Sequence, residues 1–572
     1  MKKTGGLLLL AMFFCVLLLQ GGCGSLWQSS KEKKKKRLFI TRGKLIGDYA
    51  APGQSGLSPI KIEGFALAEN LSGRGCIEPD TPMRKRVVEQ FKKDDIAKYQ
   101  QRIDSTDTAI VYVRSYLRPG IQKGDPIDVE VQLPPASNAE TLKGGIIRVA
   151  SPLTQHLNGR DSFTMAEVKG PILLDPVTYT RNDPEKEKTG YILGQAVCLK
   201  DRTFTLIVND EDRTVLVTKE IQDKINARFK IPNESEGVAE AKTDTRIDLK
   251  LHPAYRDSIY RYLQVVLSIA CFENHTEKQE RMKLLDEELL RPETSQYAAL
   301  QLEAIGKPGV ESLRKGLESQ NSDIRFYCAE SLAFLGTPDA APVLMEIAET
   351  DANHRIAALN ALGTMQNDHA AEQCLQRLLL SSEPVTRYGA FRALWHRNPN
   401  NPAIRGEQLG DENFSFSYHV LNIPGVPMVH VSKSKRSEIV LFSSGITLQP
   451  PYILAAGQEL MIQSEGEKTV VTRLKPGGIP ETRTVRNSLN EIIRAVTELG
   501  GTYPNVIQFL CEAEQKRNLT CLLKIDVFSG DDGKNLLENA VADDDLDLEP
   551  VEPEKKSAWQ RLNPASWFGK SE

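Results

Sequence analysis

The sequence has few of the residues and none of the short motifs that mark an enzyme. Only eight histidines are spread over 572 residues, and HExxH, GxSxG and phosphate-binding-loop patterns are absent. Four histidines fall in helical or repeated stretches, where surface or packing roles are expected: His252, His354, His369 and His396. We therefore expect a protein that is not an enzyme and has no catalytic residue, cofactor or metal.

No apolar run is long enough to cross a membrane comfortably. The run LLLLAMFFCVLLL, residues 7–19, follows two lysines and suits the apolar region of a signal peptide. Gly21 and Gly22 precede Cys23 as at a lipoprotein processing site, so we expect a signal peptide over 1–22 and a lipid on Cys23. A plain secretory signal cleaved nearby and an uncleaved anchor are the alternatives. All three export the chain, and which membrane would hold the anchor is left open.

An excess of charge of either sign is also missing. The 72 Lys and Arg residues stand against 76 Asp and Glu residues, so no overall basic charge points to a nucleic-acid partner. The nine cysteines are scattered without a CxxC pair, which argues against a zinc site and against a disulfide framework. Cys511 and Cys521 are the one close pair and form a candidate disulfide in an exported protein.

Charged segments flank the part of the chain that should fold. Residues 23–45 form a linker with KEKKKKR at 31–37, which we expect to be solvated, with anionic lipid headgroups as the other candidate partner. Residues 530–572 form an acidic tail containing DDDLDLEPVEPE, which we expect to be disordered.

The first folded block, residues 46–275, is rich in strand patterns. Runs of β-formers or alternating apolar residues predict strands over 109–117, 126–133 and 204–209. Gly144 and Gly145 indicate a sharp turn or close backbone approach, followed by a strand that Pro152 should end. Apolar residues four apart predict one clear helix over 213–229.

Residues 283–400 repeat with a period near thirty. Small residues align at intervals of 30, 30 and 32, and three arginines fall in register as well: Ala298, Cys328, Ala358 and Ala390, with Arg325, Arg355 and Arg387. This period predicts stacked helix pairs in which small residues let helices approach closely. The segment resembles HEAT repeats, in three to four units, and we expect an independent solenoid with an unidentified protein partner.

The second β-containing block covers residues 405–529. We expect strands over 437–448 and 519–528 and a helix over 487–501, with Ser488 and Glu491 in a capping-box pattern. Pro504 suits the first turn of a second helix that runs to about Lys516.

Several of these segments together resemble the bacterial flagellar P-ring protein family. PGIQKGDPIDVEVQLPPASNAETLKGGIIRVASPL at 119–153 is similar to a turn, strand, glycine-pair and strand series of that family. IEGFALAENLSGRG at 62–75 and KINARF at 224–229 resemble two further family segments. SEIVLFSSGITLQP and the stretch from Ser488 to Phe528 resemble its closing strands and helix pair, in the same order. One departure is Cys76, which stands where the family has an acidic residue.

The resemblance implies a fold and a role. The fold class would be an α+β multidomain protein, with β-rich P-ring-type domains in two sequence blocks interrupted by an all-α HEAT-like solenoid. The family is structural, so a homo-oligomeric periplasmic ring around the flagellar rod is expected, with rod and L-ring proteins as partners and peptidoglycan nearby. Membrane association would come from Cys23. The alternative is an envelope lipoprotein that uses this fold as a binding scaffold without a flagellar role.

Overall fold

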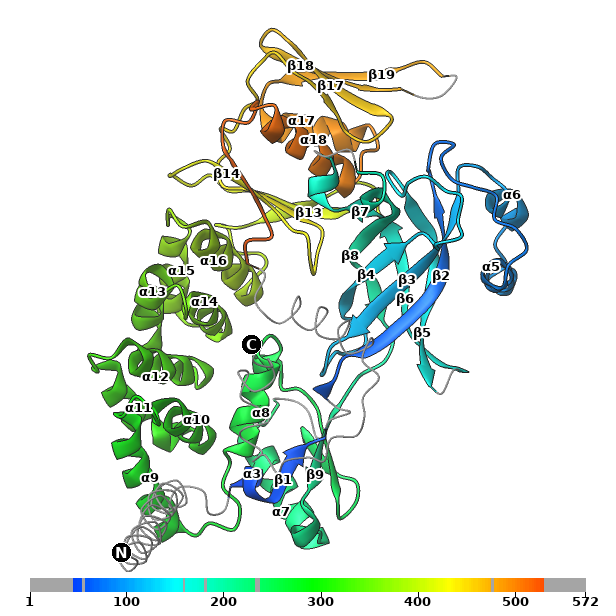
Figure 1. The fold of residues 1–572 in the computed structure, drawn as a ribbon. Helices are drawn as coiled ribbons and strands as arrows, with labels where there is room; N and C mark the ends of the chain where they lie inside the picture. Colours follow the sequence, from blue (N-terminus) through cyan, green and yellow to red (C-terminus); the bar gives the residue numbers. More distant parts are fainter. Residues whose placement is uncertain are drawn as a thin grey trace, which may run out of the picture.

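A computed structural model describes residues 45–528, except 54–56, 158–159, 180–182, 232–236 and 475–477. Four bodies follow one another around the molecule: a barrel domain, a small sheet domain, a helical solenoid and a C-terminal block (Figure 1). No helix in this described part is both long and apolar enough to span a bilayer. The predicted signal peptide, Cys23, residues 24–44 of the basic linker and the acidic tail lie outside the described residues.

The barrel domain is a sheet that closes on itself. Its strands lie in the order β4-β3-β2-β5-β6-β8-β7, and β4 also pairs with β8. The predicted strand over 109–117 is β3, and that over 126–133 is β4. The strands are β2 (Ile60–Glu69), β3 (Ala109–Leu117), β4 (Pro126–Gln132), β5 (Ile146–Leu157), β6 (Arg160–Pro171), β7 (Leu173–Leu174) and β8 (Thr189–Cys198).

The glycine pair does begin β5, but Pro152 does not end it. Gly144 has φ +79°, and a Cβ on Gly145 would lie 2.9 Å from the Leu142 carbonyl oxygen. The strand continues past Pro152 to Leu157 because register shifts between Ile147 and Ser151 accommodate the missing N–H donor.

A helical hairpin between β2 and β3 was not predicted. It comprises α5 (Pro82–Lys93) and α6 (Tyr99–Ile103). Thr81 is the N-cap residue of α5, and its side chain accepts a hydrogen bond from the Arg84 N–H. The helix buries Val87 and Phe91. Most residues of this stretch are polar, so the few apolar residues on one face of α5 do not give a clear helical pattern in the sequence.

The small sheet domain contains the antiparallel sheet β1-β9-β11-β10. The predicted helix over 213–229 is α7 (Val215–Arg228), and it buries Val217, Ile221 and Ile225. The other elements are α3 (Ile46–Tyr49), β1 (Ala50–Pro52), β9 (Phe204–Val208), β10 (Ala239–Ala241), β11 (Arg246–Leu249) and α8 (Ile259–Leu267). The segment 46–275 thus contains two separate sheets.

The solenoid consists of stacked helix pairs and starts at His275, eight residues before the predicted boundary of 283. Odd-numbered helices form one row and even-numbered helices the other (Figure 1). The helices are α9 (His275–Leu289), α10 (Ser295–Ile305), α11 (Val310–Leu317), α12 (Ser322–Phe334), α13 (Ala340–Thr350), α14 (Arg355–Thr364), α15 (His369–Leu378) and α16 (Pro384–Arg397).

The C-terminal block holds two sheets and a helix pair. One sheet has the order β12-β13-β15-β14-β20 and the other β16-β17-β18-β19. The predicted helices are α17 (Leu489–Glu498) and α18 (Tyr503–Gln515). The strands are β12 (Gly406–Leu409), β13 (Phe416–Val420), β14 (Met428–Val431), β15 (Glu438–Leu441), β16 (Ile453–Ala455), β17 (Leu460–Glu465), β18 (Lys468–Arg473), β19 (Glu481–Arg486) and β20 (Leu522–Ile525).

The predicted capping box of α17 is wrong. Ser488 is the N-cap residue but its side chain makes no cap hydrogen bond. Glu491 instead accepts hydrogen bonds from the backbone N–H and guanidinium of Arg486, because β19 ends directly beside the helix. α18 does form a capping box, between Thr502 and Asn505.

Candidate interaction sites

The repeat register corresponds to one continuous core. Ala298, Cys328, Ala358 and Ala390 lie on α10, α12, α14 and α16, and each is 0% exposed within the same apolar cluster. Small size is required here, since a Cβ on Gly316 would lie 2.2 Å from the Cys328 sulfur. Burial raises the pKa of the Cys328 thiol to about 12, so this cysteine has a packing role.

The arginines in register cap the preceding helix of each pair. Arg325 donates to the Ser319 carbonyl at 3.2 Å, Arg355 to the Ala348 carbonyl at 3.0 Å, and Arg387 to the Leu379 carbonyl at 3.2 Å. Each accepting carbonyl lies in or just after the last turn of α11, α13 or α15, where helix C-terminal oxygens lack partners and attract positive charge. The three-fold register therefore reflects a repeated capping contact.

The first end of the solenoid is joined to the small sheet domain by a buried ion network. Arg261 on α8 pairs with Glu303 on α10 at 2.5 Å and with Glu330 on α12. The Tyr255 hydroxyl donates to Glu303 at 2.6 Å. Although burial alone would lower it, the charges of the two carboxylates raise the pKa of Arg261. Leu300 of the solenoid also belongs to the apolar core of the small sheet domain.

The other end of the solenoid is joined to the C-terminal block in the same manner. Arg392 on α16 pairs with Glu438 on β15 at 2.7 Å, and the Tyr388 hydroxyl donates to Glu438 at 2.6 Å. Burial opposes ionisation of Glu438, but the charges of Arg392 and Arg436 and the Tyr388 hydrogen bond outweigh it and lower the pKa.

These two junctions contradict the expectation of an independent solenoid. The solenoid core is continuous with four side chains of the C-terminal block: Leu421, Met428, Val440 and Phe442. The repeats therefore connect the small sheet domain with the C-terminal block. Sequence reasoning missed Glu303 and Glu438, although each is a lone carboxylate within an apolar stretch, in YAALQLEAIG and SEIVLF.

The barrel domain and the C-terminal block also meet directly. Asp128 on β4 accepts hydrogen bonds from the Lys435 N–H at 2.5 Å and the Gly194 N–H at 2.8 Å. Lys433 pairs with Asp175 at 2.5 Å. Burial raises the pKa of Asp128 to about 6. Barrel residues Leu173 and Leu193 belong to the apolar core of the C-terminal block, so the barrel and the C-terminal block form one packed unit.

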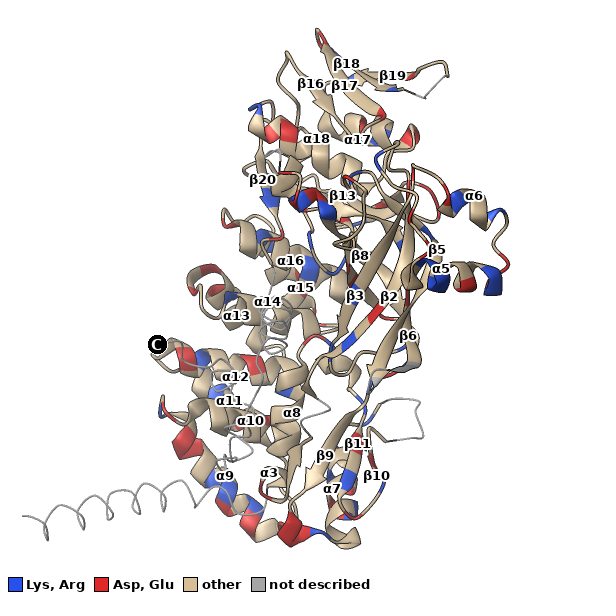
Figure 2. Cartoon of the chain, turned by 45° about the vertical axis from the view of Figure 1, so that its right-hand side comes forward, with Lys and Arg blue, Asp and Glu red and all other residues tan. Residues whose placement is uncertain are grey.

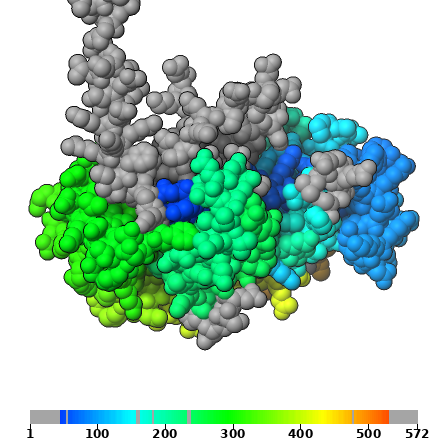
Figure 3. All heavy atoms as spheres, turned by 90° about the horizontal axis from the view of Figure 1, so that it is seen from below, coloured from blue at the N-terminus to red at the C-terminus, as the bar shows by residue number. Residues whose placement is uncertain are grey.

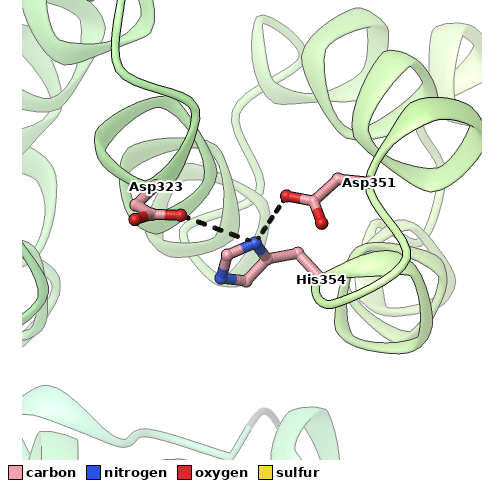
Figure 4. A group of neighbouring side chains, drawn as sticks. All are labelled: Asp323, Asp351 and His354. Atoms are coloured by element: carbon pink, nitrogen blue, oxygen red, sulfur yellow. Dashed lines mark hydrogen bonds and ion pairs between the residues drawn. The ribbon is translucent and has the colours of Figure 1, made fainter.

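One cluster in the solenoid has the residue types of a cation site (Figure 4). His354 Nδ1 lies 2.8 Å from Asp351 Oδ2 and 3.9 Å from Asp323 Oδ1. The same imidazole lies beside the Phe326 ring, with a centroid distance of 4.2 Å and an angle of 31° between the ring planes. His354 is the N-cap residue of α14, so these contacts lie at the start of that helix.

The two cysteines of the predicted disulfide both lie in the C-terminal block. Cys511 on α18 is buried and Cys521 before β20 is half-buried, and both are free thiols in the structure, so their pairing stays a prediction. Basic and acidic residues are interspersed over the visible solenoid helices rather than segregated by sign (Figure 2).

Comparison with protein families agrees with the resemblance and with the repeats. Residues 54–280 match the model of the flagellar P-ring protein family, and residues 283–355 match that of HEAT repeats. Both predicted likenesses are confirmed over these ranges, whereas the P-ring likeness of 405–529 stays a prediction. The described chain is a mixed α+β multidomain protein, as the sequence indicated.

A search of the curated proteins finds no match. A solved structure described as the complex of CpcE and CpcF of phycocyanin lyase from Nostoc sp. PCC7120 is 26% identical, covering 22% of this chain and 81% of that chain. Its TM-score of 0.18 is too low to carry an argument.

Proposed function

We propose that this protein is a structural, non-enzymatic subunit of a flagellar P-ring, in which copies of the chain form a closed periplasmic ring around the rod and support motility. The match of residues 54–280 to the P-ring family carries this proposal. The packing of the C-terminal block on the barrel supports it, because residues 405–529 would then complete the ring body.

In this proposal the solenoid has two roles. It connects the small sheet domain with the C-terminal block and thereby sets their separation within each subunit. Its outer helices present an extended surface, which is how helical repeats usually bind protein partners. Rod and L-ring proteins would contact the ring body, and lipidated Cys23 would keep the assembly near a membrane.

Imaging of purified basal bodies tests the ring directly. We expect this chain in a ring at the periplasmic level, and a deletion strain that loses motility but still exports other envelope proteins. A motile deletion strain, together with a chain that remains monomeric at high concentration, would overturn the proposal. Cys23→Ser tests the anchor separately, because it should move the protein from membranes to the soluble periplasmic fraction.

An envelope scaffold without a flagellar role is the second candidate. The observation that favours it is the solenoid inserted between the two blocks, since helical repeats commonly serve as binding surfaces. Normal motility after deletion, combined with loss of another envelope protein from purified complexes, would support this candidate.

A further inference from the structure

The start of α7 exposes an unusual combination of side chains. Val215 and Leu216 are 71% and 68% exposed, although Val217 and Thr218 beside them are buried. Three carboxylates lie in the turn Asp210–Asp212 just before the helix, where Arg213 pairs with Asp210. We call Asp210, Glu211, Asp212, Val215 and Leu216 the α7 corner. Adjacent exposed apolar side chains next to concentrated charge suggest a docking surface.

The N-terminal part of the chain enters the fold beside this corner. β1 pairs with β9, with Ala50 opposite Val208. Asn209, the residue before the three carboxylates, donates to the Asp48 carbonyl at 2.7 Å and to the Tyr49 carbonyl at 2.8 Å. Figure 1 shows α3, β1 and α7 together at the lower end of the molecule, which Figure 3 views from below. Whatever precedes Leu45 is therefore tethered close to the α7 corner.

That preceding segment is complementary to the corner in two respects. Residues 31–40 read KEKKKKRLFI, which places six cations before three large apolar residues. Only four residues separate Ile40 from Leu45, so the apolar end is held within roughly 18 Å of Leu45, at about 3.5 Å per residue. Such a short tether makes docking effectively intramolecular and gives a weak contact a high local concentration.

We propose that residues 31–40 of the same chain dock on the α7 corner. The lysines and Arg37 would pair with Asp210, Glu211 and Asp212, and Leu38, Phe39 and Ile40 would cover Val215 and Leu216. Docking makes the basic segment unavailable to anionic lipid headgroups and shortens the free linker between the predicted anchor and the folded body. This inference does not depend on the proposed ring.

Tryptic cleavage after residues 33–37 measures the docking in the full mature chain, purified in detergent. Two variants remove one half of the surface each: Asp210→Asn with Glu211→Gln and Asp212→Asn, and Val215→Ser with Leu216→Ser. We expect cleavage at least roughly fivefold faster in each variant, which corresponds to a docked fraction of about four-fifths in the wild type. In 1 M salt the wild type should approach the rate of the charge variant, since exposed ion pairs are screened.

The acidic tail provides the matched control, because it offers the same charge elsewhere in the chain. Asp543→Asn with Asp544→Asn and Asp545→Asn should leave the cleavage rate unchanged. Acceleration by this tail variant alone, or no acceleration by either corner variant, overturns the proposal. A photo-crosslinker at position 216 gives an independent readout. Adducts with residues 31–40 of the same chain are expected, whereas adducts with lipid or with a second copy only would overturn it.

Discussion

The two ends of the solenoid are joined to their neighbouring bodies by the same three residue types, arginine, glutamate and tyrosine. At each junction an arginine pairs with a buried glutamate on the other body, and a tyrosine hydroxyl donates to that glutamate at 2.6 Å. The polarity is reversed: the small sheet domain supplies arginine and tyrosine at the first end, whereas the solenoid supplies both at the second. Both junctions therefore hold charge in a sheltered site and fix the orientation of the two bodies.

The ends differ in what remains if the central glutamate is lost. Arg261 at the first end has a second carboxylate partner, Glu330. At the second end Glu438 is the one carboxylate paired with Arg392 among the described residues, and the neighbouring His430 is neutral, since burial lowers its pKa to about 3. The second junction should thus be the more fragile.

Deletion of residues 283–400, closed with a flexible linker, should have the largest effect. It would expose Met428, Val440 and Phe442, which pack in the solenoid core, and would leave Arg261 unpaired. We expect loss of cooperative folding, seen as aggregation in size-exclusion chromatography. A soluble, monodisperse deletion protein with a sharp thermal transition would show that the junctions are dispensable.

Replacing each of the two buried glutamates compares the stability of the two junctions directly. Glu438→Gln should lower the free energy of unfolding by about 3–5 kcal/mol, because Arg392 keeps its charge in a buried site without a carboxylate. Glu303→Gln should cost less, about 1–3 kcal/mol, since Glu330 still pairs with Arg261. Urea unfolding of both variants measures the difference. Equal losses would show that Glu330 does not compensate.

A substitution of Ala358 tests how tightly the solenoid helices pack between the two junctions. Ala358→Trp should destabilise the protein by about 3 kcal/mol, because a side chain that is 0% exposed between helices must separate them to admit an indole. Ala352→Trp is the matched control, since Ala352 is exposed and the change there should stay within about 0.5 kcal/mol. Similar melting temperatures for both variants would show that the solenoid helices accommodate the indole at position 358 without loss of stability.

The sequence predicts local structure and repeats better than it predicts how the bodies join. The helix α7 and the register of Ala298, Cys328, Ala358 and Ala390 follow from periodicity, which is a local property. The contacts of Glu303 and Glu438 depend on residues 42 and 46 positions away in the chain, so no local pattern identifies their partners. The same applies to Pro152, because the bulge that tolerates it is set by the neighbouring strand.

Asp128 lies in the direct contact between the barrel and the C-terminal block, and its effect on stability should depend on pH. Its folded-state pKa of about 6 lies above the ordinary value of 3.8, so the folded protein binds this proton more tightly than the unfolded chain. Its contribution to stability should therefore decrease as pH rises from about 4 to 6, by at most about 1.4 kcal/mol per pH unit. Asp128→Asn should remove this slope, which urea unfolding at several pH values measures as the difference from the wild type.

Asp175→Asn provides a control of opposite sign. Burial opposes the ionisation of Asp175, but Lys433 outweighs this and lowers the pKa, so the contribution of wild-type Asp175 to stability increases as pH rises. A difference between wild type and Asp128→Asn that does not change from pH 4 to 6 would mean that the hydrogen bonds from Gly194 and Lys435 fully offset the burial of the carboxylate.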